Sequence, residues 1–99
     1  MSETKRGYVY IVTNKAMGTL YIGATSDLIK RMWEHKNHLV DAFTKKHGCG
    51  LLVYYEIHDT IEAAILREKQ MKEWKRNWKL RQIIDMNPTW RDLYDDILL

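Results

Sequence analysis

Two tyrosines, an arginine and a histidine lie within one short stretch near the start of the chain, between Gly7 and His35. Tyr10 and Tyr21 each stand in the middle of a short segment of alternating apolar residues, and Arg31 precedes His35 by one helical turn. A guanidinium can hold an anion, and a phenol and an imidazole can move a proton. We therefore interpret this stretch as a compact site that a hairpin and a helix deliver to one place.

The two tyrosine-containing segments are expected to be strands. Residues 7–13 and 19–24 alternate as strands do, and the turn-forming residues 14–18 between them favour an antiparallel hairpin. If Tyr10 lies directly opposite Tyr21, with Thr13 opposite Gly18, both phenols point to the same face. A register shifted by one residue would send them to opposite faces. Gly23 removes a side chain where another group can approach closely.

A helix is predicted to follow, with Ser26 or Asp27 as its cap, and to run to about Val40. Its apolar stripe has helical spacing and is formed by Leu28, Met32, Leu39 and Phe43, helped by Ile29 and Trp33. Arg31, His35 and His38 are expected to stand in a row beside that stripe.

The rest of the chain predicts one more strand and two or more helices. Residues 45–50 are expected to form a loop, and residues 51–58 (LLVYYEIH) a third strand that joins the hairpin. Asp59 and Glu62 form a capping-box pattern for the next helix. Pro88 suits the first turn of a last helix, whose apolar residues are Trp90, Leu93, Tyr94, Ile97 and Leu98.

Glu68 falls on an otherwise apolar stripe of the helix that follows residue 60. Ile61, Ala64 and Ile65 share that stripe at helical spacing. A carboxylate drawn toward a core is costly unless it is paired, hydrogen bonded or bound to a metal. Glu68 is therefore either half of a buried salt bridge or a metal ligand, and the spacing leaves both open.

Positive charge is concentrated in residues 61–82, which hold seven basic and three acidic side chains, whereas residues 85–99 hold one basic and four acidic ones. Such a surface suits nucleic acid, or it is a solvated helix face. Trp74 and Trp78 lie among these cations; they either contribute to binding or pack on the sheet. The residues that we expect to contact nucleic acid are Lys30, Arg67, Lys72, Lys75, Arg76 and Lys79.

The composition predicts one globular domain over residues 1–99 that carries a net charge of +3. Cys49 is the only cysteine, which excludes an intrachain disulfide. The polar start lacks the apolar core of a signal peptide, and no stretch approaches the ~18–20 apolar residues of a membrane span. We expect a cytoplasmic protein.

The hairpin and helix resemble the GIY-YIG endonuclease superfamily. The first half-motif is Tyr8-Val9-Tyr10, with tyrosine in place of the usual glycine, and the second is Tyr21-Ile22-Gly23. The spacing to the helix arginine, YIGATSDLIKR, looks like the family pattern, and Glu68 matches the family's metal-binding glutamate. The runs LLVYYE, REKQMKEWKR and NPTWRDL look like small stand-alone bacterial members, which are related to the nuclease domain of the excision-repair C subunit.

The resemblance implies an α+β fold, in which a three-stranded antiparallel sheet is flanked by helices and the two tyrosines converge. It also implies hydrolysis of phosphodiester bonds in DNA with one Mg²⁺ or Mn²⁺ ion held by Glu68. The substrate would be DNA, with single-stranded, branched or damaged forms among the candidates, and the function DNA repair or processing. The implied catalytic residues are Tyr10, Tyr21, Arg31, His35 and Glu68.

Two positions depart from the family pattern. Ala24 stands where active members often carry a lysine, and Leu80 stands near the position of a family asparagine, with Asn77 one turn early. These departures leave two alternatives: a binding module of the same fold that does not cut, or a nuclease subunit that needs a partner. The segment from Trp90 to Leu99, apolar and acidic, would be the docking surface for such a partner.

Overall fold

The core of the protein is a three-stranded antiparallel sheet in the order β2-β1-β3. The computed structural model describes residues 6–40 and 42–99. The central strand is β1 (Gly7–Thr13), flanked by β2 (Leu20–Thr25) and β3 (Leu51–His58). The expected α+β class, hairpin and third strand are therefore confirmed.

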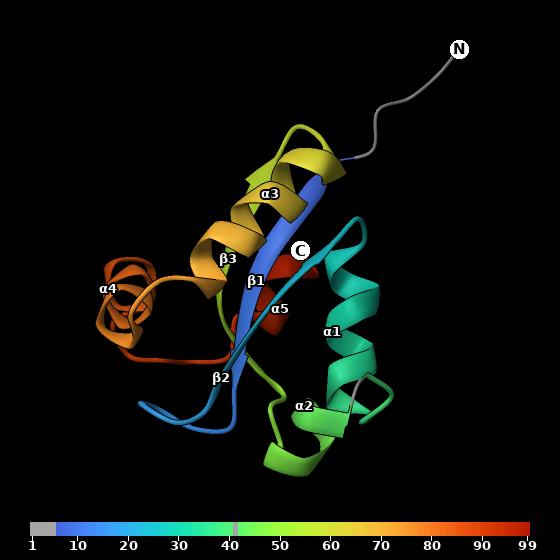
Figure 1. The fold of residues 1–99 in the computed structure, drawn as a ribbon. Coiled ribbons are helices and arrows are strands. Elements are labelled where there is room, and N and C mark those ends of the chain that lie inside the picture. Colours follow the sequence, from blue (N-terminus) through green and yellow to red (C-terminus); the bar gives the residue numbers. More distant parts are fainter. Residues whose placement is uncertain (1–5, 41) are drawn as a thin grey trace.

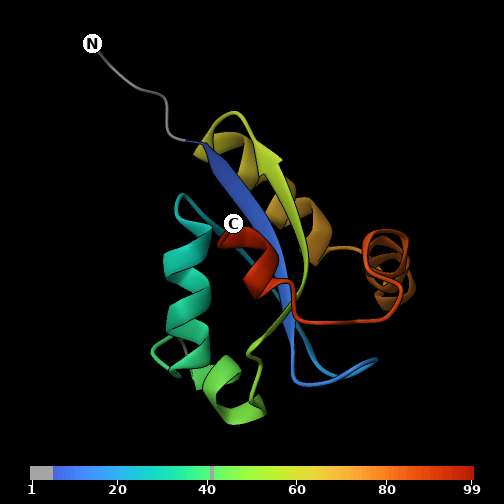
Figure 2. The same ribbon diagram turned by 180° about the vertical axis from the view of Figure 1, so that it is seen from behind.

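Helices cover both faces of the sheet. On one face lie α3 (Ile61–Lys72) and α4 (Arg76–Met86), and on the other lie α1 (Leu28–Lys36) and the short α5 (Tyr94–Ile97) (Figure 1). Seen from behind, α1 and α5 lie against the sheet, and α2 (Ala42–His47) leads from α1 toward β3 (Figure 2). Among the described helices, none has the length and apolar character needed to cross a membrane.

Alternation along β1 supplies both halves of the core. Val9 and Ile11 pack toward α3, and Tyr10 and Val12 pack toward α1, all with no exposed surface. β3 pairs with β1 through an irregularity, because Ile11 faces Tyr54 whereas Val12 faces Leu52. Val53 is therefore the extra residue of a bulge, and both it and Tyr54 join the cluster beneath α3.

The first helix is shorter than the sequence predicts. Asp27 caps it as expected, but α1 ends at Lys36, and His38 takes a left-handed backbone conformation with φ 58°. The expected row of Arg31, His35 and His38 therefore stops before His38. Leu39 is 63% exposed instead of lying on an apolar stripe, and the side chain of Phe43 lies outside what the structure describes. Ile29 and Trp33, at 44% and 51% exposed, also lie outside the core.

Three other local expectations are corrected. Helix α2 occupies part of the predicted loop 45–50 and runs to His47, before Gly48 at φ 64°. Thr60, not Asp59, caps α3, because its hydroxyl accepts a hydrogen bond from the backbone N–H of Ala63 at 3.1 Å. The predicted last helix is reduced to α5, and the segment before it is irregular.

That irregular segment, residues 87–93, is fastened to β3. The buried amide of Asn87 donates to the carbonyls of Val53 (3.2 Å) and Arg91 (2.8 Å). The backbone N–H of Leu93 donates to the carbonyl of Leu52 at 2.7 Å. Trp90 and Leu93 are 7% and 5% exposed, so these two apolar residues of the expected docking segment pack on the protein's own core.

Candidate active site

The hairpin places Tyr10 and Tyr21 on the face of the sheet that α1 covers. Tyr10 lies opposite Gly23, and Tyr21 lies opposite Val12. The predicted pairing of Tyr10 with Tyr21 is therefore wrong by two residues. A shift of two preserves the face on which each side chain lies, so the two phenols still share one face.

His35 of α1 meets both tyrosines. The hydroxyl oxygen of Tyr10 lies 3.0 Å from Nε2 of His35, within hydrogen-bond distance. The ring centroid of His35 lies 5.4 Å from that of Tyr10 and 5.6 Å from that of Tyr21, with both pairs edge to face. Three of the five predicted catalytic side chains are therefore brought together.

The second half-motif ends in Gly23 because the side chain of Tyr10 occupies the space that a larger residue would need. A Cβ atom at this position would lie 2.3 Å from the hydroxyl oxygen of Tyr10 and 2.4 Å from its Cζ. The phenol of Tyr10 therefore passes over the backbone of β2 on its way to His35. The close approach that the sequence predicts at this glycine is confirmed, and the approaching group is a tyrosine of the same protein.

The two phenols differ in their access to solvent. Tyr10 has no exposed surface and His35 has 1%, whereas Tyr21 is partly exposed. Tyr21 lines a hollow of about 270 Å³ together with Lys72 and Lys79. A substrate can therefore reach Tyr21, while Tyr10 and His35 support it from within the protein.

Glu68 of α3 is paired with a lysine that lines this hollow. Its side chain is only 15% exposed and forms an ion pair with Lys72, whose side chain is 51% exposed. Ala64 and Met71, on the same side of α3, are fully buried. The predicted apolar stripe is only partly correct, because Ile65 is 39% exposed. The expected salt bridge is present, but its lysine lies half in water and is not buried. Lys72 connects Glu68 to the hollow of Tyr21.

A divalent cation would find one carboxylate here. Within residues 6–40 and 42–99, no three His, Cys, Asp or Glu side chains are grouped as a metal site. Mg²⁺ retains several waters and accepts one or two carboxylates, so Glu68 with water fits this ion. The ion would compete with the ammonium of Lys72 for the carboxylate.

Arg31 lies one turn before His35 on α1, near the other end of β2. Its Nε forms an ion pair with Glu34 at 3.2 Å, and its side chain is 37% exposed. Arg31 and Lys30 line a hollow of about 160 Å³ with Asp27 and Glu34. The structure thus places this guanidinium at the surface, where it is accessible to an anion.

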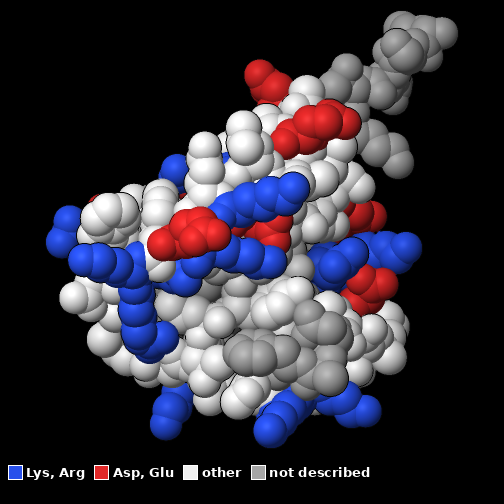
Figure 3. Space-filling model, viewed as in Figure 1, with Lys and Arg blue, Asp and Glu red and all other residues white. Residues whose placement is uncertain are grey.

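The basic residues predicted to bind nucleic acid fall into two groups. Lys and Arg side chains gather over the α3 and α4 side, with acidic groups between them (Figure 3). Arg67 is held by Glu56, and Arg76 donates to the carbonyls of Met17 (2.9 Å) and Gly18 (2.7 Å), so both also fasten the fold. The other predicted residues are lysines that reach the surface: Lys30, Lys72, Lys75 and Lys79.

Sequence reasoning missed a polar network centred on Glu56. Arg67 donates to both oxygens of this carboxylate at 3.1 and 3.0 Å, Tyr54 also donates to it, and Nε2 of His58 lies 2.9 Å from it. Burial alone would raise the pKa of Glu56, but these hydrogen bonds outweigh burial and lower it. Burial and the hydrogen bond to Glu56 raise the pKa of Tyr54. Tyr54, Glu56 and His58 alternate along β3, and this period of two was the available signal.

The two positions that depart from the family pattern are apolar in the structure as well. Ala24 and Leu80 both pack against the core cluster beneath α3, and Asn77 is exposed on α4. Neither position therefore supplies a polar group. The cations at the Tyr21 hollow come instead from Lys72 and Lys79.

The chain is similar to known proteins in sequence. A family model described as the GIY-YIG catalytic domain matches residues 6–82. The chain is 40% identical over 76 residues to a UPF0213 protein of Staphylococcus saprophyticus, which covers 77% of this chain and 92% of the relative. UPF0213 proteins of Syntrophus aciditrophicus (37% over 84 residues, 84% of this chain and 94% of the relative) and Streptococcus pyogenes serotype M5 (38% over 81 residues, 81% and 87%) are also similar. Among solved structures, none gives a significant match.

Proposed function

Because this chain belongs to the GIY-YIG family, we propose that it is an endonuclease that hydrolyses phosphodiester bonds in DNA with one Mg²⁺ or Mn²⁺ ion. The observation that carries the proposal is the hollow at β2. There the partly exposed Tyr21, backed by a buried Tyr10–His35 hydrogen bond, lines the same hollow as the lysine that pairs with Glu68.

Tyr21 is the proposed general base. An unperturbed tyrosine has a pKa of ~10, so it accepts a proton from water near neutral pH only where positive charge stabilises its phenolate. Lys72 and Lys79, on the wall of the same hollow, are placed to supply this charge. His35 and Tyr10 fix the ring of Tyr21 from below, because the imidazole contacts both phenols.

Arg31 and Glu68 are the proposed phosphate and metal ligands. The guanidinium of Arg31 is exposed and suits two phosphate oxygens at once. Glu68 and water would hold the divalent ion, which supplies Lewis-acid polarisation of the phosphate and stabilises the leaving oxygen. Lys72 is the partner that the ion would displace from the carboxylate of Glu68.

Phosphate contacts give affinity but no sequence readout. The exposed lysines near the hollow attract the DNA backbone, and the binding constant should fall steeply with salt. Repair or processing of unusual DNA structures, in place of cleavage at a fixed sequence, is the role that this surface supports best.

The experiment is incubation of the purified protein with plasmid and end-labelled single strands in Mg²⁺ or Mn²⁺. We expect cleavage that stops with EDTA and that is lost in Glu68→Ala and Arg31→Ala. Equal cleavage by the wild type and Glu68→Ala would identify a contaminant and reject the proposal. Glu62→Ala, an exposed glutamate on the same helix, is the matched control that should cut normally.

A second candidate is a nucleic-acid-binding module that does not cut, which the apolar residues Ala24 and Leu80 favour. It predicts salt-sensitive binding that survives Glu68→Ala and no cleavage with either metal. Addition of cell extract separates this candidate from a subunit that needs a partner, because only the latter would then cut.

A further inference from the structure

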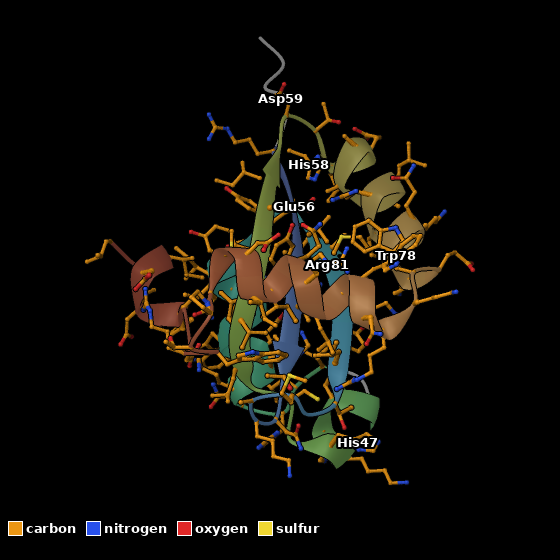
Figure 4. The ribbon with its side chains drawn as sticks, turned by 90° about the vertical axis from the view of Figure 1, so that its left-hand side faces the viewer. His47, Glu56, His58, Asp59, Trp78 and Arg81 are labelled. Atoms are coloured by element: carbon orange, nitrogen blue, oxygen red, sulfur yellow. The ribbon has the colours of Figure 1, made fainter. Side chains whose placement is uncertain are left out.

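A second hollow lies at the corner between α3 and α4, apart from the proposed catalytic residues. It has a volume of about 190 Å³ and is lined by Trp74, Trp78, Arg81 and Gln82. Figure 4 shows Trp78 and Arg81 on α4, and Glu56 on the neighbouring strand β3. The catalytic proposal uses none of these residues.

Hydrogen bonds and a cation–π contact fix two of the residues that line this hollow, Trp74 and Gln82. The guanidinium of Arg67 lies 4.8 Å from the ring centroid of Trp74, and Glu56 holds that guanidinium with two parallel hydrogen bonds. Tyr54, which also bonds to Glu56, lies 3.4 Å from the amide oxygen of Gln82. Trp74 and Gln82 are therefore fixed by one polar network.

Trp78 forms the open wall. Its ring centroid lies 6.3 Å from that of Trp74 at an interplanar angle of 69°, so the two indoles meet as a corner. Trp78 is nevertheless 52% exposed. A single exposed apolar side chain needs no explanation, but the ring of Trp78 packs edge to face on Trp74, and both rings line one hollow.

The ligand that suits the hollow between Trp74 and Trp78 is a flat, neutral ring attached to an anion. The volume is below the ~300–1,000 Å³ of whole-ligand pockets, so the hollow takes a planar group and not a complete small molecule. Lys75, Lys79 and Arg81 lie within three residues of Trp78 in the sequence, and Arg81 also lines the hollow; Glu73 is the nearest acid in sequence. Aromatic rings among cations bind unpaired nucleobases by stacking while the cations hold the phosphates.

The hollow between Trp74 and Trp78 lies next to the hollow of Tyr21 along α4. Lys79, next to Trp78 on α4, lines the hollow of Tyr21, and Arg76 fastens the start of α4 to the β1–β2 turn through Met17 and Gly18. A DNA strand whose phosphate lies at Lys79 thus passes the exposed indole of Trp78.

We propose that Trp78 and Trp74 bind one unpaired nucleobase beside the scissile phosphate. This inference rests on the proposed function, and it narrows the substrate to DNA with an unpaired base.

The test compares two fluorescein-labelled duplexes, one fully paired and one with a single unpaired thymidine, by anisotropy in EDTA. The wild type should bind the second duplex about 5- to 150-fold more tightly, which corresponds to the ~1–3 kcal/mol of one stacked base. Trp78→Ala should remove this preference, and Trp78→Phe should keep most of it. Trp33→Ala is the matched control, because Trp33 is 51% exposed on α1, on the opposite face of the sheet.

The outcomes separate this proposal from the nuclease proposal, because no cleavage is needed. Equal affinity of wild type and Trp78→Ala for the duplex with the unpaired base overturns the stacking proposal, whether or not the protein cuts DNA. A preference that depends on Trp78, without cleavage in Mg²⁺ or Mn²⁺, supports stacking and rejects the nuclease. Circular dichroism of Trp78→Ala should match the wild type, since the side chain is half exposed.

Discussion

Two glutamates of almost equal burial have very different surroundings. The side chain of Glu56 on β3 is 17% exposed, and that of Glu68 on α3 is 15% exposed. Glu56 has Arg67 on both oxygens, with Tyr54 and His58 beside it. Glu68 is paired with Lys72, a side chain on the next turn of its own helix that is half in water.

Burial alone therefore does not identify a functional carboxylate; the number and rigidity of its partners do. Arg67 is a planar fork held against Trp74, and its displacement from Glu56 would leave a half-buried charge without compensation. Lys72 is flexible and strongly hydrated, so a divalent ion can replace it at Glu68 at small cost. We infer that Glu56 stabilises the fold and that Glu68 is available for chemistry.

The largest expected effect is the loss of DNA cleavage in the variant Glu68→Gln. Loss of the carboxylate that we propose binds the metal should lower the cleavage rate constant by about 100-fold or more, as removal of one group that stabilises the transition state does in other enzymes. The free energy of unfolding, measured in urea, should change by less than ~0.5 kcal/mol. Full activity of Glu68→Gln beside an inactive but folded Glu56→Gln would reverse the roles of the two carboxylates.

Glu56→Gln should show the opposite profile. The amide cannot accept the bidentate pair in the same way and leaves Arg67 charged and half-buried. Because both side chains are partly exposed, the cost should be about 1.5–3 kcal/mol and not the larger penalty of a fully buried pair. The urea midpoint gives this value, with Glu62→Gln as the exposed control. A cost below ~0.5 kcal/mol would show that the network contributes no stability.

The pH dependence of stability should follow Glu56. Its folded pKa is lowered from 4.5, because hydrogen bonds from Arg67, Tyr54 and His58 outweigh the effect of burial. The unfolded state therefore takes up the proton first, so this contribution is present above pH 4.5 and is lost as pH falls through the lower folded value. Urea unfolding below pH 4.5 should bring the wild type and Glu56→Gln closer together. A gap that widens on acidification would contradict the assignment.

The strands and the convergence of the site were accessible from the sequence because both depend on local patterns. The richness of residues 51–58 in β-branched and aromatic side chains predicts the bounds of β3 correctly. The two half-motifs correctly predict that Tyr10 and Tyr21 share a face, since that outcome needs only the parity of the register and not its exact value.

What the sequence could not supply depends on conformations and contacts without a local signal. The hairpin register is wrong by two residues because the turn extends to Thr19, contains Met17 at φ 58°, and is closed by a hydrogen bond from Thr19 to Asn14. The end of α1 was missed because a left-handed His38 is not apparent from its type. Glu56 resembles a solvent-facing strand residue until α3 brings Arg67 to it.

The smallest expected effect is on the stability of Lys72→Met. The pair that Lys72 forms with Glu68 joins positions i and i+4 of one helix, and its lysine lies half in water; i, i+4 pairs of this kind contribute only ~0.3–0.5 kcal/mol. Arg67→Met, which removes the corresponding cation from Glu56, should cost several times more, because Arg67 also covers the ring of Trp74. Urea unfolding of the two variants side by side measures the ratio of their losses in unfolding free energy.

If Lys72→Met loses as much stability as Arg67→Met, the folded state needs the lysine beside Glu68 as much as it needs the arginine beside Glu56. A metal ion could then not replace Lys72 without loss of stability. A small cost for Lys72→Met would instead mean that the carboxylate of Glu68 is held loosely, as a carboxylate that exchanges its partner for a metal ion must be.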